Sequence, residues 1–122
     1  MDSILIIDDS ATIRESLEFV LTKEGFTVDQ AEDGQEGLEK FKKNRNYSLV
    51  IVDWNMPVMT GIEFLKEARK ISKTIPIMLL TTVTDHDKIE MARKYKANAW
   101  LVKPFVEKDL MNVVKTFVKM KH

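Results

Sequence analysis

The chain has 122 residues, of which 44% are hydrophobic and 31% charged, and its nineteen basic residues balance nineteen acidic ones. This composition predicts one globular domain over residues 1–122, and a net charge of zero gives no general attraction to nucleic acid or to an anionic membrane. Cysteine is absent, which excludes disulfides and thiolate metal sites and favours a cytoplasmic location. No apolar run approaches the length of a membrane span, so we expect no membrane insertion.

Short apolar runs alternate along the chain with longer segments in which apolar residues recur every three or four positions. The longer segments predict five helices. Ser10 is suited to cap the first helix and Gly25 to end it, Thr60-Gly61 precede the third helix, and Asp85 is a candidate cap for the fourth. The apolar runs predict five strands, at residues 4–7, 27–31, 49–52, 75–80 and 99–102.

Five strands that alternate with five helices predict an α/β fold of the (βα)5 type, with helices on both faces of a parallel sheet. The first, third and fourth runs are the most continuously apolar, so we expect them at the centre of the sheet. The second run contains Asp29 and Gln30 and suits an edge. These positions give the doubly wound strand order 2-1-3-4-5, in which ligands bind beyond the carboxyl ends of the strands.

Polar side chains stand at the carboxyl ends of four predicted strands. Three carboxylates there would raise each other's pKa, and a hard divalent cation such as Mg2+ would resolve that conflict. With an added hydroxyl and amine, the group suits phosphoryl transfer, in which Asp53 would become an acyl phosphate. Each residue alone also fits a cap, a turn, a strand or a loop, so the prediction depends on their convergence. The residues are Asp8, Asp9, Asp53, Thr81, Thr82 and Lys103.

Four segments of the chain, ILIIDDS, LVIVDWNMPVMTG, IMLLTT and LVKPF, occur in this order. With them, the chain resembles the receiver domains of two-component response regulators from Ser3 to about Met120. The resemblance is strongest to the stand-alone, chemotaxis-regulator type. It implies a signalling protein rather than an enzyme, which accepts a phosphoryl group from a sensor histidine kinase, a phosphotransfer protein or a small phosphodonor.

The resemblance also implies a role for each residue of the predicted site. Asp53 would be the phosphoryl acceptor. Mg2+, or Mn2+ in its place, would be held by Asp8, Asp9, Asp53 and the backbone carbonyl of Asn55. Thr81 would turn towards the phosphoryl group, and Lys103 would pair with one of its oxygens. The peptide bond between Lys103 and Pro104 would be cis.

Output would pass to a downstream target such as a motor switch, an enzyme or a relay protein. The resemblance places the target's binding site on the fourth helix, fifth strand and fifth helix. Two residues depart from the family pattern: Thr82 stands where a small residue is usual, and the switch aromatic is Trp100 rather than Tyr or Phe. The expected surface comprises Met91, Tyr95, Trp100, Val106 and Met111.

Other functions fit parts of the same sequence. A flavodoxin-like cofactor binder is disfavoured because Asp8 and Asp9 would repel a phosphate group unless a metal intervened. An aspartyl-phosphate phosphohydrolase needs an acid two residues after its nucleophile, and that position is Asn55. A phosphorelay intermediate and a constitutive interaction module (a pseudo-receiver) stay open, as does the choice between chemotaxis and another pathway.

Overall fold

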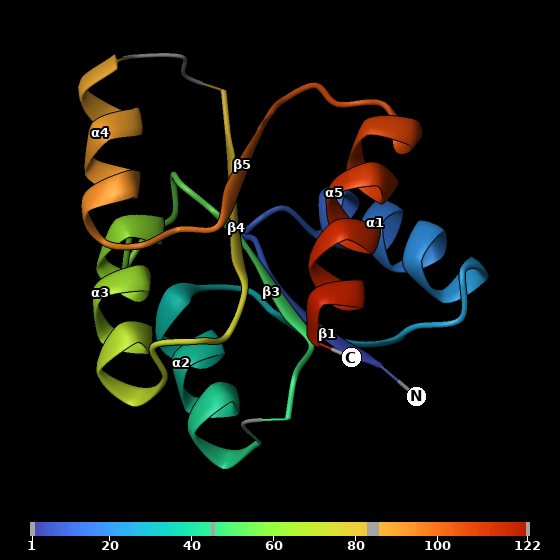
Figure 1. The fold of residues 1–122 in the computed structure, drawn as a ribbon, viewed down its shortest axis with the longest axis horizontal. Helices are drawn as coiled ribbons and strands as arrows, with labels where there is room; N and C mark the ends of the chain where they lie inside the picture. Colours follow the sequence, from blue (N-terminus) through green and yellow to red (C-terminus); the bar gives the residue numbers. More distant parts are fainter. Residues whose placement is uncertain (1, 45, 83–85, 122) are drawn as a thin grey trace.

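The computed structural model describes residues 2–44, 46–82 and 86–121, and in these ranges five strands alternate with five helices (Figure 1). The strands are β1 (Ser3–Ile7), β2 (Thr27–Ala31), β3 (Leu49–Asp53), β4 (Ile77–Thr81) and β5 (Ala99–Val102). The helices are α1 (Ala11–Lys23), α2 (Gly34–Lys43), α3 (Gly61–Ile71), α4 (His86–Lys94) and α5 (Glu107–Lys121). Asp85, the predicted cap of α4, lies outside the described residues.

All strand pairs are parallel and the order is β2-β1-β3-β4-β5, which confirms the predicted fold and topology. The polar strand β2 lies at an edge, and β3 and β4 are buried along their whole length. In the register of the sheet, Asp53 pairs with Leu80 and Thr81 pairs with Val102. The carboxyl ends of β3, β4 and β5 therefore lie side by side.

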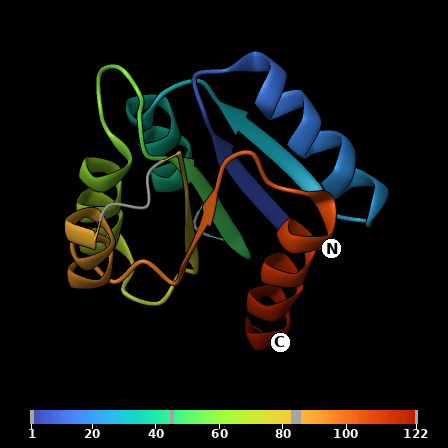
Figure 2. The same ribbon diagram turned by 90° about the horizontal axis from the view of Figure 1, so that it is seen from above.

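The sheet is the middle of three layers. Helices α1 and α5 cover one face, and α2, α3 and α4 cover the other (Figures 1 and 2). The alternation along β1 shows this directly, because Ile4 and Ile6 pack in the core with residues of α1 and α5, whereas Leu5 and Ile7 pack in the core with residues of α2 and α3. Both faces of the central strands are apolar for this reason.

Strand β4 begins at Ile77, two residues later than the sequence predicted. The backbone of Ile75 is held by side chains instead of a strand: its N–H donates to Ser72 Oγ at 3.1 Å and its carbonyl accepts from Arg69 Nη1 at 2.8 Å. Pro76 has no N–H to give to a sheet. The strand therefore starts at Ile77, although the Pro76 carbonyl already accepts from the Val50 N–H of β3 at 3.0 Å.

The predicted helix signals in the described ranges act as caps. Ser10 Oγ accepts from the Ile13 N–H, and Thr60 forms a reciprocal capping box with Glu63. Gly25 follows the end of α1 with a φ of +96°, in the left-handed region where glycine costs least. The described helices include none that is long and apolar enough to cross a bilayer.

Candidate functional site

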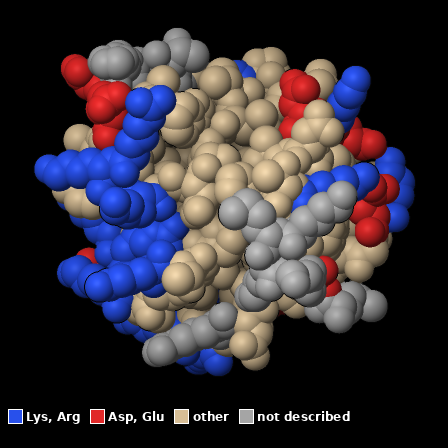
Figure 3. Space-filling model, in the orientation of Figure 1, with Lys and Arg blue, Asp and Glu red and all other residues tan. Residues whose placement is uncertain are grey.

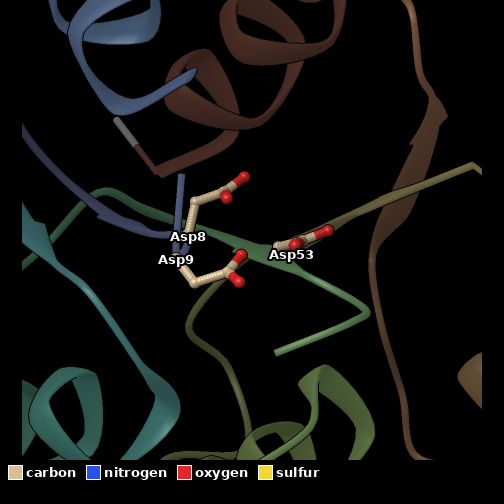
Figure 4. Close-up of side chains that lie close together, drawn as sticks. All are labelled: Asp8, Asp9 and Asp53. Carbon is tan, nitrogen blue, oxygen red and sulfur yellow. The ribbon is translucent and has the colours of Figure 1, made fainter. Parts of the chain in front are cut away.

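Three aspartates meet at the carboxyl edge of the sheet. Asp8 and Asp9 follow β1 and Asp53 ends β3, and their side chains lie close together (Figure 4). Each offers a carboxylate oxygen within 4.8 Å of the others. Asp8 and Asp53 are buried, at 0% and 5% exposed, whereas Asp9 is exposed. The cluster is thus set into the protein and open to solvent on the side of Asp9.

Lys103 supplies the positive charge of the site. Its Nζ lies 3.2 Å from Asp8 Oδ2 and 3.1 Å from Asp53 Oδ1. The residue follows β5, and its backbone N–H donates to the Thr81 carbonyl at 2.7 Å. This hydrogen bond to the end of β4 fixes the position of the lysine backbone. The peptide bond between Lys103 and Pro104 is cis. One ammonium group thereby bridges two carboxylates that come from different strands.

The charges of the site shift the pKa values of its members. Burial raises the pKa of Asp53 above its ordinary value and nearby Asp8 adds to this, while Lys103 and the Asn55 backbone N–H oppose the rise. Burial on its own would lower the pKa of Lys103, but Asp53 and Asp8 outweigh burial and hold that pKa above its ordinary value. One lysine faces three carboxylates, so the cluster retains room for additional positive charge. Its hard oxygen donors fit Mg2+.

Arg14 is a contributor to the site that sequence reasoning missed. Its Nη1 donates to the Asp8 carbonyl at 2.5 Å and its Nε donates to Gln30 Oε1 at 2.9 Å. The Ser10 N–H also donates to Asp8 Oδ1 at 2.9 Å. The start of α1 therefore holds Asp8 in place through both its backbone and its carboxylate. The available signal was the position of Arg14 one helical turn beyond the cap Ser10.

The two threonines after β4 lie in different surroundings. Thr81 is 5% exposed at the end of the strand, next to the site, whereas Thr82 is exposed. Thr82 lines a cleft of about 450 Å3 together with Lys103. The other lining residues come from α1 and from the segment after β5, and they are Ile13, Ser16, Pro104 and Phe105. The site therefore adjoins a cleft that Lys103 and Thr82 both line.

The residues just after Asp53 also border the site. Trp54 is 8% exposed and its N–H donates to the Leu80 carbonyl at 2.8 Å, while Lys88 Nζ lies 5.7 Å from the centroid of its indole ring. Asn55 is exposed and directs its backbone N–H to the Asp53 carboxylate. Gly61 approaches this segment so closely that a Cβ there would lie 2.6 Å from the Asp53 carbonyl oxygen.

The structure divides the predicted partner surface. Met91 and Val106 are 45% and 59% exposed, and Trp100 is partly buried with the Arg93 guanidinium 5.5 Å from its ring centroid. Tyr95 is partly buried on the side of α3, where Lys66 Nζ lies 4.7 Å from its ring centroid. The inclusion of Met111 was wrong. This residue is 7% exposed because it lies on the face of α5 that packs against the core.

Comparison with known proteins gives a consistent result. The model of the response regulator receiver domain family matches residues 4–115. The chain is 38% identical over 117 residues to the chemotaxis protein CheY1 of Helicobacter pylori, covering 91% of this chain and 94% of that protein. It is 36% identical over 119 residues to the transcriptional regulatory protein CpxR homolog of Haemophilus influenzae, covering 98% of this chain but only 51% of that longer protein.

Solved structures agree with this fold. The chemotaxis protein CheY4 of Vibrio cholerae, crystallised at low pH, superposes with a TM-score of 0.91 at 40% identity, covering 96% of this chain and 98% of that one. The response regulator TrrA of Thermotoga maritima, solved in complex with Mg(2+)-BeF, gives 0.87 at 38% identity, covering 96% of this chain and 99% of that one. Receiver domains take phosphate from histidine kinases. This chain belongs to the response regulator receiver domain family, and it is a phosphoacceptor signalling protein rather than a catalytic enzyme.

Proposed function

We propose that Asp53 is the phosphoryl acceptor of a Mg2+-dependent switch and that residues 1–122 form a single receiver domain. The observation that carries this proposal is the bridge from Lys103 to Asp53 and Asp8 within a cluster of three carboxylates. Asp53 is the member that ends a central strand and also faces the lysine. Its position beside the exposed Asp9 gives a phosphodonor access from solvent.

In the proposed reaction, a carboxylate oxygen of Asp53 attacks the phosphorus of a phosphohistidine on the kinase or phosphotransfer protein. The new O–P bond replaces the N–P bond, and the released histidine nitrogen takes up a proton from solvent. Asp53 must be ionised to attack, and Lys103 together with the Asn55 N–H favours that form against burial. Lys103 and the Thr81 hydroxyl then hold the phosphoryl oxygens.

The proposed metal ligands are Asp8, Asp9, Asp53 and the Asn55 backbone carbonyl. Bound there, Mg2+ would neutralise the carboxylates and the charge that develops on the transferring group. Arg14 and Ser10 serve this arrangement because they fix the backbone and the carboxylate of Asp8. Mn2+ has the same preference for hard oxygen ligands and would substitute.

For output, the phosphoryl group adds up to about two negative charges beside Lys103 and Thr81. We expect the surface formed by Met91, Trp100 and Val106 to change its population of conformers and to bind a downstream protein. The relatives that bear the name chemotaxis protein favour chemotaxis as the pathway. Action inside the cell, in the cytoplasm, follows from such a role.

Intact-mass spectrometry tests the acceptor. Incubation with acetyl phosphate and Mg2+ should raise the mass by one phosphoryl group, and Asp53→Asn should abolish the gain. Asp109→Asn, an exposed aspartate of α5, is the matched control and should keep it. Omission of Mg2+ with added EDTA should slow the reaction by at least about a hundredfold, the scale on which charge stabilisation acts in such transfers. A gain that persists in Asp53→Asn would refute the assignment.

Tryptophan fluorescence gives a second readout of the same site. Trp54 directly follows Asp53, so Mg2+ should change its emission, and a Trp100→Phe variant removes the contribution of the other indole. A titration with Mg2+ in this variant, with and without Asp9→Asn, tests the metal ligands. Unchanged affinity after Asp9→Asn would remove Asp9 from the ligand set.

A further inference from the structure

Positive charge gathers at one end of this electrically neutral protein. Seven basic residues and one acidic residue lie in residues 66–73 and 93–96, which are the ends of α3 and α4 and the segments that follow them. Lys and Arg atoms accordingly cluster on the left of the space-filling view, where Figure 1 places α3 and α4 (Figure 3). A protein whose net charge is zero thus presents a concentrated positive field on one side.

This charge surrounds a concavity. A cleft of about 350 Å3 lies between the C-terminal parts of α3 and α4, and we call it the basic cleft. The Tyr95 ring lies between two ammonium groups, with Lys66 Nζ at 4.7 Å and Lys94 Nζ at 5.5 Å from its centroid. The other basic residues that line the basic cleft are Arg69, Lys70 and Lys96.

Arg69 connects the two walls of the basic cleft by hydrogen bonds. Its Nη2 donates to the Lys96 carbonyl at 2.7 Å and to Asn98 Oδ1 at 2.9 Å, and its Nη1 donates to the Ile75 carbonyl at 2.8 Å. Asn98 Oδ1 also accepts from the Ile77 N–H at 2.8 Å. The guanidinium therefore ties α3 to the segments before β4 and β5. Its hydrogen bonds satisfy the donors without cancelling the charge, because the acceptors are neutral.

Most of the positive charge in the basic cleft is left uncompensated. Glu67 lines the cleft but pairs with Lys70 at 2.9 Å. Within the described ranges, no carboxylate forms an ion pair with Lys66, Lys94 or Lys96, although Lys66 lies near enough to Glu63 to help lower the pKa of that carboxyl. Compensation of helix dipoles accounts for basic residues in the last turn of a helix. It does not account for Lys66 in the middle of α3 or for Lys96 beyond the end of α4.

The backbone of Lys96 has a conformation that glycine would adopt at lower cost. Lys96 has a φ of +69°, a left-handed conformation that a side chain with a Cβ disfavours. The corresponding position after α1 is occupied by Gly25, with a φ of +96°. The same backbone geometry therefore carries glycine at one helix end and a lysine at the end that borders the basic cleft.

We propose that the basic cleft is a docking site for an acidic segment of a partner protein, distinct from the phosphorylation site. The lysine stems and the Tyr95 ring offer apolar walls and the ammonium groups offer charge, which suits glutamate side chains next to an apolar residue. The charge converges on one small concavity, whereas a nucleic acid requires a stripe of phosphate contacts. A membrane would need large exposed apolar residues, and none of those in the described ranges lines the basic cleft: they are Phe19, Val58, Met91, Val102 and Val106.

The location of the basic cleft makes docking independent of phosphorylation. Arg69 joins it to residues 75–77 and 98, where β4 and β5 begin, whereas Asp53 and Lys103 lie where strands end. The acidic segment and the phosphodonor thus engage opposite edges of the sheet. An acidic docking segment would raise the local concentration of a kinase or target without occupying the crevice.

Fluorescence anisotropy with a fluorescein-labelled peptide of glutamates around central leucines tests the docking site. We expect saturable binding at low salt that weakens at least about tenfold in Lys66→Glu/Lys94→Glu, since charge reversal opposes an acidic ligand. The matched control is Lys42→Glu/Lys43→Glu, two exposed lysines of α2 with the same change in charge, which should bind as the wild type does. Asp53→Asn should also bind normally.

Each other outcome overturns the proposal. These outcomes are no saturable binding, equal loss in both double variants, or tighter binding of single-stranded oligo(dT) or of phosphatidylglycerol vesicles than of the peptide. Intact-mass measurement with acetyl phosphate is run on the Lys66→Glu/Lys94→Glu protein. A retained phosphoryl gain shows that the variant is folded and that the two sites fail separately.

Discussion

The sheet has two edges formed by the ends of its strands, the carboxyl edge and the amino edge. They carry opposite charge, and the charge is held differently at each. At the carboxyl edge, three aspartates share one lysine, and two of the aspartates are buried. At the amino edge, lysines line an open cleft, and the arginine beneath them is held by neutral oxygen acceptors.

The difference teaches how each edge is suited to its ligand. Burial, and after it the charge of nearby Asp8, raises the pKa of Asp53, so the carboxyl edge is electrostatically unfavourable until a cation or a phosphoryl group alters it. Exposed lysines are solvated and repel one another little, so the amino edge can stay charged without a ligand. Chemistry belongs to the first edge and docking to the second.

Among substitutions that affect one edge and not the other, Gly61→Ala should have the largest effect on stability. The added Cβ would lie 2.6 Å from the Asp53 carbonyl oxygen and 2.9 Å from Trp54 Cα, both backbone atoms that cannot yield without moving the carboxyl edge. We expect the free energy of unfolding to fall by about 3 kcal/mol and phosphoryl uptake to slow, while the acidic peptide still binds to the folded protein. Urea denaturation and intact-mass kinetics measure the first two effects.

Gly25→Ala is the matched control for that substitution. Gly25 has no heavy atom within 4 Å of an added Cβ, so its cost is only the left-handed backbone, about 1 kcal/mol. If Gly61→Ala and Gly25→Ala lower the free energy of unfolding equally, the close approach of the backbone at Gly61 does not constrain the site.

A smaller effect, of opposite sign, is expected at the amino edge. Lys96→Gly relieves the left-handed backbone and should raise the free energy of unfolding by about 1 kcal/mol. The same change removes a positive charge from the basic cleft and should lower the affinity for the acidic peptide. Thermal unfolding and anisotropy on one sample test both halves, and a variant that gains stability without losing affinity would remove Lys96 from the docking site.

The smallest expected effect is the pH dependence of stability at the carboxyl edge. The pKa of Asp53 is raised from 3.8, so its contribution to stability is present below pH 3.8 and is lost as pH rises through the folded-state pKa. Asp53→Asn cannot ionise and should therefore be more stable than the wild type at neutral pH, with the gain vanishing below pH 3.8. Thermal unfolding across pH 3 to pH 8 checks this expectation.

Glu63 offers a control of the opposite sign. Its pKa is lowered by hydrogen bonds from Thr60, so the ionised form is the one that stabilises the capping box. Glu63→Gln should lose stability above the ordinary carboxyl pKa and match the wild type in acid. If Asp53→Asn, like Glu63→Gln, lowers stability at neutral pH, then burial of the Asp53 carboxylate beside Asp8 is not destabilising the folded protein.

Much of the fold followed from simple sequence patterns. Continuous apolar runs placed β1, β3 and β4 at the centre, and Asp29 and Gln30 placed β2 at an edge. Because parallel strands end at the same edge, the order of strands also brought Asp8, Asp9, Asp53 and Lys103 together. One error was local: the predicted strand began at residue 75, two residues before β4. Ser72 and Arg69 hold the backbone of Ile75 by hydrogen bonds, and these two residues lie outside the apolar run.

Helix faces were less predictable. On α5, Met111 was expected on the partner surface. The structure buries Leu110, Met111 and Val114, while Val113 is partly buried. Apolar residues on three sides of a helix fix its rotation poorly, and the neighbouring helix and sheet decide it.

The sequence by itself determined the parallel sheet, its strand order and the identity of the acidic site. Periodicity and residue type at the strand ends are local properties that the chain carries wherever it packs. Only the tertiary structure decided how the charges are compensated. Lys103 bridges two aspartates, Arg14 secures Asp8, and Arg69 joins the walls of a basic cleft whose lysines come from separate helices. These arrangements depend on contacts between residues far apart in the chain, and no local pattern encodes them.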